Sequence, residues 1–465
     1  MYSNFKRIRF LLIIVMLVFL GVSLYLVYFQ LFEAKALNAH SANSRNYLDE
    51  GNIIRGKIYD QSGELLASNL DEGDKKRISE YPYSLAHIIG YDSKEHGKSG
   101  IESTYNAQLL GLSEDDLLGA MKDFMGKKGT GNDLYLTLNA QLQSYIFSLL
   151  ESHKGAVAVM DPVSGKVLSL VSSPSFNTNE VDLNWQNLIE REDGVLLGRG
   201  AQGLYTPGSI IKLLTATALL ESGLSLDYYD EGVERIGTSE IYNFEGAVEG
   251  EISLEEALVY STNTYFANKA LLVGPQKLKE VAQRFYFNAS YPFELHHESS
   301  YIDYEEGMED VDLAASGYGQ GKTLVTPLHM AMMISGVSQN GNMMQPYIVK
   351  EIRSPSGTKL LETKDKLLSE MTSPSIGRQM RQMLIKVVED NGYNYLQGLE
   401  IGGKTGTAEN PSGKDHAWYI SFAKGTSKEL ALAIVLEEEG ISGGRVAAPI
   451  AQLIYEKAMQ LGLID

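Results

Sequence analysis

The 465-residue sequence contains no cysteine. That absence excludes a disulfide framework, a thiol nucleophile and a metal site built on cysteine ligands. Basic residues are also outnumbered: 40 Lys and Arg stand against 59 Asp and Glu, for a formal net charge of −19. An acidic chain of this kind is a poor candidate for binding the phosphate backbone of nucleic acids. We therefore expect neither thiol chemistry nor a nucleic acid partner.

Long apolar runs are rare, and the chain has one, FLLIIVMLVFLGVSLYLVYFQLF, at residues 10–32. Its 23 residues carry no formal charge and can cross a bilayer core of ~30 Å as a helix. Three basic residues within 6–9 precede it, which places residues 1–9 in the cytoplasm. A cleaved signal peptide is the alternative, because residues 34–36 (Ala-Lys-Ala) resemble a cleavage site, but the apolar core of a signal peptide is usually about 7 to 15 residues long. We expect a retained single-pass anchor in the cell membrane, with the rest of the chain outside the cytoplasm.

The composition changes near residue 134, where a dense globular region begins. Residues 33–133 are polar and contain a strand–turn–strand pattern at 53–69, which predicts a small, mainly β domain. Residues 134–465 read as a helix, two strands around the turn at 161–165, a mostly helical middle, three strands and a last helix. This order predicts an α+β domain in which both ends form one antiparallel sheet of five strands, with a helical subdomain inserted between them.

Ser209 and Lys212 lie three residues apart at the start of an apolar helix, in YTPGSIIKLLTA (205–216). Residues with this spacing share a helical face, so the Lys212 amine can reach the Ser209 oxygen. Burial lowers the pKa of a lysine, and an uncharged lysine could remove the proton that keeps a serine hydroxyl unreactive. The alternative is a serine N-cap with a lysine that extends to solvent. The pattern alone does not decide, because Ser-x-x-Lys also begins at Ser3 and Ser356.

A second candidate element, YSTNTYF at 260–266, carries Ser261 and Asn263 on a loop between two helical stretches. The helix before it opens with Ser253 and Glu256, which form a capping-box pattern. The Ser261 hydroxyl could relay a proton to a leaving amine, and the Asn263 amide could hold a substrate carbonyl. An ordinary helix cap is the alternative interpretation.

The third element is GGKTGTAE at 402–409, the one place where Lys-Thr-Gly occurs. Its three glycines remove side chains around Lys404, which suits a strand that a ligand must approach closely. Lys404 and the hydroxyls of Thr405 and Thr407 could bind a substrate carboxylate. The backbone N–H groups of Thr407 and Ser209 could form an oxyanion hole. A Gly-rich hairpin with a surface lysine is the alternative.

Taken in order, Ser-x-x-Lys, Ser-x-Asn and Lys-Thr-Gly resemble the signature of the penicillin-recognising serine transpeptidases, a family that includes penicillin-binding proteins and serine β-lactamases. The stretches at 158–176, 317–331 and 415–423 are similar to that family as well. Those at 55–67 and 99–111 resemble the N-terminal module of its class B members, which have one anchor, a non-catalytic pedestal and a transpeptidase domain. The resemblance makes residues 33–133 the pedestal and residues 134–465 the transpeptidase domain.

This resemblance implies a peptidoglycan D,D-transpeptidase that needs no metal or cofactor. Ser209 would attack a stem peptide ending in D-Ala-D-Ala, D-Ala would leave, and an amine of a neighbouring strand would take the acyl group. β-Lactams would acylate the same serine. The implied substrates are strands derived from lipid II, and the implied partner is a polytopic membrane glycosyltransferase. The family assigns catalysis to Ser209, Lys212 and Ser261, and substrate binding to Asn263, Lys404, Thr405, Gly406 and Thr407.

Three related activities stay open: a D,D-carboxypeptidase, a membrane-bound β-lactamase and a β-lactam sensor. EVDLN at 180–184 resembles the glutamate loop of class A β-lactamases. It precedes Ser209, whereas that loop follows the Ser-x-Asn element in those enzymes, and we interpret it as a coincidence. A bifunctional enzyme would need a glycosyltransferase domain before residue 134, for which residues 33–133 are too few.

Overall fold

The computed structural model describes residues 2–28, 53–70, 76–112, 129–393, 396–410 and 412–465. Helix α1 spans Tyr2–Tyr28, and its apolar side chains from Phe10 to Leu20 are exposed. The last residues of the predicted anchor, 29–32, lie outside the described ranges. Within those ranges, no helix combines the length and the apolar character that a membrane crossing requires. The single-pass anchor therefore stays a prediction.

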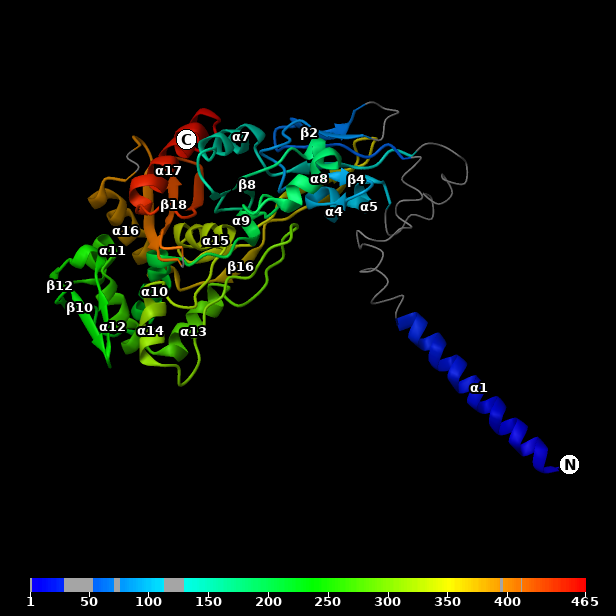
Figure 1. Ribbon diagram of the computed structural model, residues 1–465, viewed down its shortest axis with the longest axis horizontal. Helices are drawn as coiled ribbons and strands as arrows, with labels where there is room; N and C mark the ends of the chain where they lie inside the picture. Colours follow the sequence, from blue (N-terminus) through cyan, green and yellow to red (C-terminus); the bar gives the residue numbers. More distant parts are fainter. Residues whose placement is uncertain (1, 29–52, 71–75, 113–128, 394–395, 411) are drawn as a thin grey trace.

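A five-stranded antiparallel sheet forms the centre of the transpeptidase domain (Figure 1). Its strand order is β17-β18-β19-β7-β8, so strands from both ends of the domain meet in one sheet, as predicted. The strands are β7 (Gly155–Met160), β8 (Val167–Ser173), β17 (Glu400–Ala408), β18 (His416–Lys424) and β19 (Glu429–Leu436).

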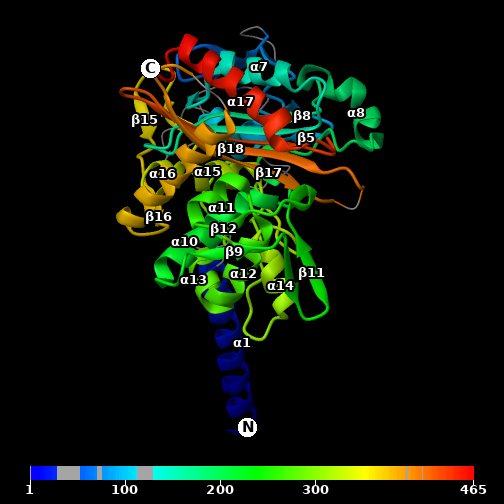
Figure 2. The same cartoon turned by 90° about the vertical axis from the view of Figure 1, so that its left-hand side faces the viewer.

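Both faces of this sheet are covered, and the alternation along β7 shows how. Val157 and Val159 belong to a core shared with helices α7 (Ala140–Leu149) and α17 (Gly443–Gln460). Ala156, Ala158 and Met160 belong to the core on the opposite face, where the wholly buried helix α15 (Pro327–Ser338) packs. Figure 2 shows these layers, with α7 and α17 on one side of the sheet and α15 on the other.

The predicted helical subdomain lies beyond α15 (Figure 2). It carries one small hairpin, β10 with β11, and a separate antiparallel pair, β9 with β12. Its elements are α10 (Lys212–Ser222), β9 (Tyr228–Asp230), β10 (Val233–Ile236), β11 (Ser239–Tyr242), η5 (Phe244–Gly246), β12 (Gly250–Ile252), α11 (Leu254–Tyr260), α12 (Asn263–Val273), α13 (Pro275–Arg284) and α14 (Asp310–Gly317). Helix α16 (Pro374–Asn391) packs between this subdomain and β17. Strand β13 (Asn342–Met344) pairs with β16 (Leu367–Glu370) in a two-stranded antiparallel sheet.

A second sheet joins the pedestal to the transpeptidase domain. Strand β6 (Asp133–Leu136) lies parallel to β1 of the pedestal on one side and antiparallel to β14 on the other. The predicted boundary between residues 133 and 134 therefore falls inside a strand. The full order is β15-β14-β6-β1-β2-β3, with β1 (Ile58–Tyr59), β2 (Leu65–Asn69), β3 (Arg77–Ser79), β14 (Val349–Arg353) and β15 (Lys359–Glu362).

The rest of the pedestal packs around a buried ion-pair cluster. Glu102 accepts hydrogen bonds from Arg55 at 2.7 Å and from Arg77 at 2.6 Å. Its short elements are β4 (Asp92–Ser93), β5 (Gly97–Lys98), α4 (Gly100–Thr104) and α5 (Asn106–Leu109). Three short helices of the transpeptidase domain lie next to the pedestal: η3 (Thr178–Glu180), α8 (Val181–Glu190) and α9 (Arg199–Gln202).

Candidate active site

Ser209 lies in the 3-10 turn η4 (Gly208–Ile211), directly before α10. Gly208 has a φ of 57°, and a Cβ on it would stand 2.5 Å from the carbonyl oxygen of Thr407. Only glycine combines this left-handed conformation with so close an approach. The Gly208 N–H donates to Gly319 O at 3.0 Å. This bond fixes the turn to the loop that follows residue 317, while the turn itself packs on β17, and Ser209 faces the same cavity as that strand.

Lys212 is fully buried, which excludes the interpretation of a lysine that extends to solvent. Its Nζ lies within hydrogen-bonding distance of Ser261 O (2.6 Å), Asn263 Oδ1 (2.8 Å) and Ser261 Oγ (3.2 Å), and as a neutral amine it can donate to two of these acceptors and keep its lone pair. Burial, helped by the charge of Lys404, holds the pKa of Lys212 well below its usual range. The amine is therefore suited to be an uncharged base. Its hydrogen-bond partners among the described residues do not include Ser209, and the direct contact between the two stays a prediction.

Ser261 connects the two lysines of the predicted motifs. It occupies the C-cap of α11 with a φ of 59°, a left-handed conformation that turns the chain toward α12. Its Oγ lies 2.9 Å from Lys404 Nζ and 3.2 Å from Lys212 Nζ. A hydroxyl can accept two hydrogen bonds and still donate one. Once Lys212 is protonated and both lysines donate to Ser261 Oγ, the Ser261 hydrogen is left for a third group in the cavity.

Lys404 is 1% exposed, and burial lowers its pKa to about 7. It belongs to β17, which pairs with β18 on one side and ends the sheet on the other. Thr405 and Thr407 line the cavity from this strand. An edge strand offers its free backbone groups to a bound peptide. The strand is thus suited to hold the end of an extended substrate.

The sequence suggests that the glycines of this strand let a ligand approach closely, but the structure gives them a different role. A Cβ on Gly402 would stand 2.3 Å from the ring of Phe422, and one on Gly403 would stand 2.8 Å from Ile420 O, so both are required by packing within the sheet. A Cβ on Gly406 would stand 2.9 Å from Pro207 O. Gly406 therefore lets the turn that carries Ser209 approach β17, rather than a ligand.

All three motifs meet in one cavity of about 230 Å³. None of the described residues that line it is an aspartate or a glutamate. Four aromatic side chains, which no motif in the sequence identifies, form part of its wall. The predicted site residues that line it are Ser209, Ser261, Asn263, Lys404, Thr405 and Thr407, and the aromatic residues are Phe244, Tyr260, Tyr318 and Tyr393.

A buried carboxylate, Asp230, supports the Ser261 loop from behind. It accepts hydrogen bonds from Thr264 Oγ1 at 2.6 Å and from Asn243 Nδ2 at 2.9 Å. Asn243 Oδ1 in turn accepts from the Thr264 N–H at 3.1 Å, and Asn263 Nδ2 donates to Tyr242 O at 3.1 Å. The sequence offers one signal for this residue, an Asp two positions before Gly232, where a side chain commonly bonds the backbone of a turn.

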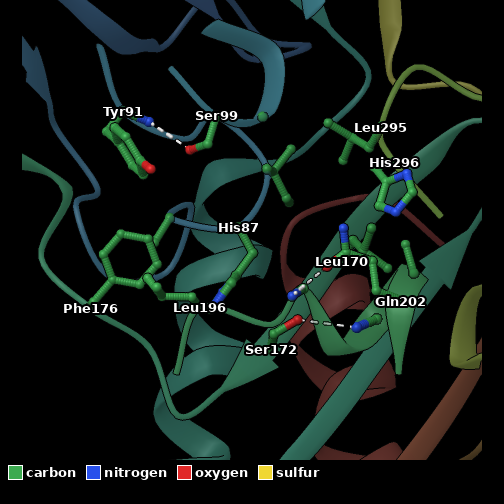
Figure 3. A pocket seen from close by; sticks show the side chains of 16 residues that line it. His87, Tyr91, Ser99, Leu170, Ser172, Phe176, Leu196, Gln202, Leu295 and His296 are labelled. Carbon is green, nitrogen blue, oxygen red and sulfur yellow. Dashed lines mark hydrogen bonds between the residues drawn. The ribbon is translucent and has the colours of Figure 1, made fainter. Parts of the chain in front are cut away.

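Another cavity lies between the pedestal and the transpeptidase domain, lined by residues of α9, β8 and the pedestal (Figure 3). It holds none of the predicted site residues. His87 Nε2 donates a hydrogen bond there to Val195 O at 2.8 Å, and burial lowers the pKa of His87 to about 4. The EVDLN stretch lies in η3 and α8 and does not line the cavity that holds Ser209.

Comparisons with known proteins agree with this geometry. Residues 155–456 match the model of the penicillin-binding protein transpeptidase domain, and residues 55–134 match that of the penicillin-binding protein A dimerisation domain. Peptidoglycan D,D-transpeptidase PbpA of Mycolicibacterium smegmatis is 29% identical over 476 residues, which cover 93% of this chain and 94% of that protein.

Solved structures give the same result. The ceftriaxone acyl-enzyme complex of penicillin-binding protein A from M. tuberculosis superposes with a TM-score of 0.83 at 27% identity, covering 89% of this chain and 100% of that one. The imipenem acyl-enzyme complex of the same protein has a TM-score of 0.81 at 28% identity, over 89% of this chain and 100% of that one. Because the transpeptidase model spans more than half of the sequence, this chain belongs to the penicillin-binding protein transpeptidase family.

Proposed function

We propose that this protein is a peptidoglycan D,D-transpeptidase that works through an acyl-enzyme on Ser209. The observation that carries the proposal is the meeting of three distant segments in one cavity, with Ser209 on its wall and two buried lysines sharing the Ser261 hydroxyl. Relatives and solved neighbours that bear the names of D,D-transpeptidases and of β-lactam acyl-enzyme complexes support it.

In the acylation step, neutral Lys212 takes the Ser209 proton while the Ser209 oxygen attacks the carbonyl carbon of the penultimate D-Ala. The backbone N–H groups of Ser209 and Thr407 are the proposed donors to the developing oxyanion. The proton passes from Lys212 through Ser261 Oγ, 3.2 Å away, to the departing nitrogen. The C–N bond breaks, D-Ala leaves with that proton, and the acyl group stays on Ser209.

Substrate binding falls to the groups on β17 and at the start of α12. Protonated Lys404, with the Thr405 and Thr407 hydroxyls, would hold the terminal carboxylate of the donor peptide. Asn263, already fixed by Lys212 and by Tyr242 O, would hold a carbonyl of its backbone. Gly406 serves by letting the nucleophile turn and the strand approach each other.

The fate of the acyl-enzyme separates this function from its rivals. Class A β-lactamases hydrolyse their acyl-enzyme with water that a glutamate activates, and no carboxylate lines the cavity among the described residues. Glu180, the glutamate of the EVDLN stretch, lies in η3 and outside that wall. This arrangement favours a long-lived acyl-enzyme that an incoming amine resolves, over a β-lactamase.

For the whole chain we propose the architecture of a class B member: a cytoplasmic tail (1–9), an anchor in the cell membrane (10–32), a pedestal (33–133) and an extracytoplasmic transpeptidase domain (134–465). The exposed apolar side chains of α1 support the anchor. The proposed partner is a polytopic glycosyltransferase of the shape, elongation, division and sporulation type. Purification in a mild detergent that preserves membrane complexes, with no such partner recovered, would count against it.

The test of the activity uses a donor peptide ending in D-Ala-D-Ala, with and without an acceptor amine, and mass spectrometry of the products. We expect release of D-Ala and a cross-linked product, both lost in Ser209→Ala and strongly slowed in Lys212→Ala. A hydrolysed donor without cross-linked product would identify a D,D-carboxypeptidase. Rapid loss of a penicillin adduct would identify a β-lactamase, and a stable adduct without any peptide turnover would identify a sensor.

A further inference from the structure

We propose that Glu437, acting through Tyr205, is a positioning residue for the nucleophile. The inference rests on the proposed role of Ser209. Neither Glu437 nor Tyr205 lines the cavity that holds Ser209, so neither can touch the substrate there. Both belong to a buried network that ends on the segment leading into the nucleophile turn.

Glu437 follows β19 directly and gathers three donors. Its Oε1 accepts from Tyr205 Oη at 2.8 Å and from Arg199 Nε at 2.8 Å, and its Oε2 pairs with Lys154 Nζ at 2.9 Å. Burial opposes the ionised form, but the hydrogen bonds from Lys154 and Tyr205 and the charge of Arg199 outweigh it and lower the pKa of Glu437. Hydrogen bonds to an ionised acceptor are roughly twice as strong as neutral ones. Tyr205 is therefore held by one strong bond.

Arg199 keeps the carboxylate in place from the other side. Its NH1 donates to Gly194 O at 2.8 Å and its NH2 to Asp193 O at 2.5 Å, so each of the three guanidinium nitrogens donates a hydrogen bond. The helix that carries it, α9, is fixed on β8: Gly200 N donates to Ser172 Oγ at 3.1 Å, and a Cβ on Gly200 would stand 2.6 Å from Leu170. Figure 3 shows Ser172 and Leu170 among the side chains that line the cavity next to the pedestal. Glu437 thus has a rigid support.

Tyr205 connects Glu437 to the segment that leads into the nucleophile turn. Its backbone exchanges two hydrogen bonds with Val325, at 3.0 and 2.8 Å. Its ring stands edge-on to Trp418, with centroids 6.0 Å apart, and the Trp418 indole N–H donates to Thr206 O at 3.0 Å. Pro207 and Gly208 are the two residues that separate Thr206 from Ser209. A shift of the Tyr205 ring would move Trp418 and Thr206, and with them the start of η4.

Such a shift matters because Ser209 lies on a four-residue turn, not in the middle of a long helix. A misplacement of about 1 Å at a reacting atom can slow a reaction by about a hundredfold. The loss of one support among several should move the oxygen by less. We expect a slower chemical step, with binding of the ligand unchanged.

The test is Tyr205→Phe in the full-length protein, which removes one hydroxyl and keeps the ring and all ion pairs. Stopped-flow measurements with a penicillin separate the dissociation constant of the non-covalent complex from the rate constant of acylation. We expect the acylation rate constant to fall about tenfold and the dissociation constant to stay within twofold. The matched control is Tyr347→Phe, since Tyr347 is also buried and its Oη donates to a carboxylate, Asp365 Oδ1, at 2.8 Å. That control should lose similar thermal stability and acylate at the wild-type rate.

A double-mutant cycle with Glu437→Gln tests the order of action. If Glu437 acts through Tyr205, most of the effect of Glu437→Gln on acylation should vanish in the Tyr205→Phe background. The inference would be overturned if Tyr205→Phe acylated at the wild-type rate, or if Tyr347→Phe were slowed as much as Tyr205→Phe. Additive effects of Tyr205→Phe and Glu437→Gln on the acylation rate constant would overturn it as well. No adduct on the wild-type protein would instead refute the proposed function itself.

Discussion

Replacing Gly208 by alanine probes how closely the nucleophile turn must approach β17. The new Cβ would stand 2.5 Å from Thr407 O, about half an ångström inside the closest approach that real Cβ atoms make. Backbone on both sides leaves no flexible side chain to move, so the turn and the strand must separate. Since a 1 Å displacement can cost about a hundredfold in rate, half of that should slow acylation by about tenfold.

Gly223→Ala is the matched control. Gly223 is the C-cap of α10, the helix that follows the turn η4. Its φ is 61°, close to that of Gly208, and nothing lies within 4 Å of the position of its Cβ. Both alanines would pay the left-handed penalty of roughly 1–2 kcal/mol. Only Gly208→Ala should add the cost of the close contact, about 1–3 kcal/mol for overpacking.

The assay is the rate of labelling by a fluorescent penicillin, with thermal melts of both variants in parallel. We expect Gly223→Ala to melt earlier but to be labelled at the wild-type rate. Gly208→Ala should melt earlier still and be labelled about tenfold more slowly. Equal labelling of Gly208→Ala and the wild type would refute the reasoning that the approach of the turn to β17 sets the position of Ser209.

Three further predictions concern Lys404, Ser261 and Asp230. Burial lowers the pKa of Lys404 from 10.5 to about 7, so between pH 7 and 10.5 the unfolded chain binds more protons than the folded chain. The free energy of unfolding should therefore rise with pH over this range. Lys404→Gln should flatten that rise, as measured by urea denaturation at several pH values. Ser261→Ala and Ser261→Gly should both acylate at least about a hundredfold more slowly, because the bridging hydroxyl is lost. The glycine variant should be more stable than the alanine variant by about 1 kcal/mol, because residue 261 has a left-handed backbone conformation. Asp230→Asn replaces one of the two acceptor oxygens by an NH2 donor that faces other donors, and it should lower the free energy of unfolding by about 1–3 kcal/mol, measured by chemical denaturation. Unchanged stability would contradict the place of Asp230 in the network.

Much of the catalytic domain could be predicted from the sequence because its signals are local. Strands β7 and β19 are nearly continuous apolar runs, GAVAVM and ELALAIVL, a pattern typical of strands buried on both faces. The capping box of Ser253 and Glu256, predicted before Ser261, is present. The three motifs also contain six of the residues that line the cavity: Ser209, Ser261, Asn263, Lys404, Thr405 and Thr407.

Other features depend on contacts between distant segments and leave little trace in the sequence. Strand β6 pairs with β14, more than 200 residues later in the chain, and the residues of neither strand indicate which strand it pairs with. The spacing of Ser209 and Lys212 predicts a shared face, but the observed acceptors of the Lys212 amine come from the Ser261 loop. Glu437 reads as one acid among several at the end of a strand. Its three donors come from separate segments.

The central claim is that Ser209 is the nucleophile of the cavity where the three motifs meet. Peptide-level mass spectrometry after incubation with a penicillin tests it most directly. The account predicts one added penicillin on the peptide that contains Ser209, and none on the Ser209→Ala protein. An adduct on another residue, or equal modification of Ser209→Ala, would contradict it.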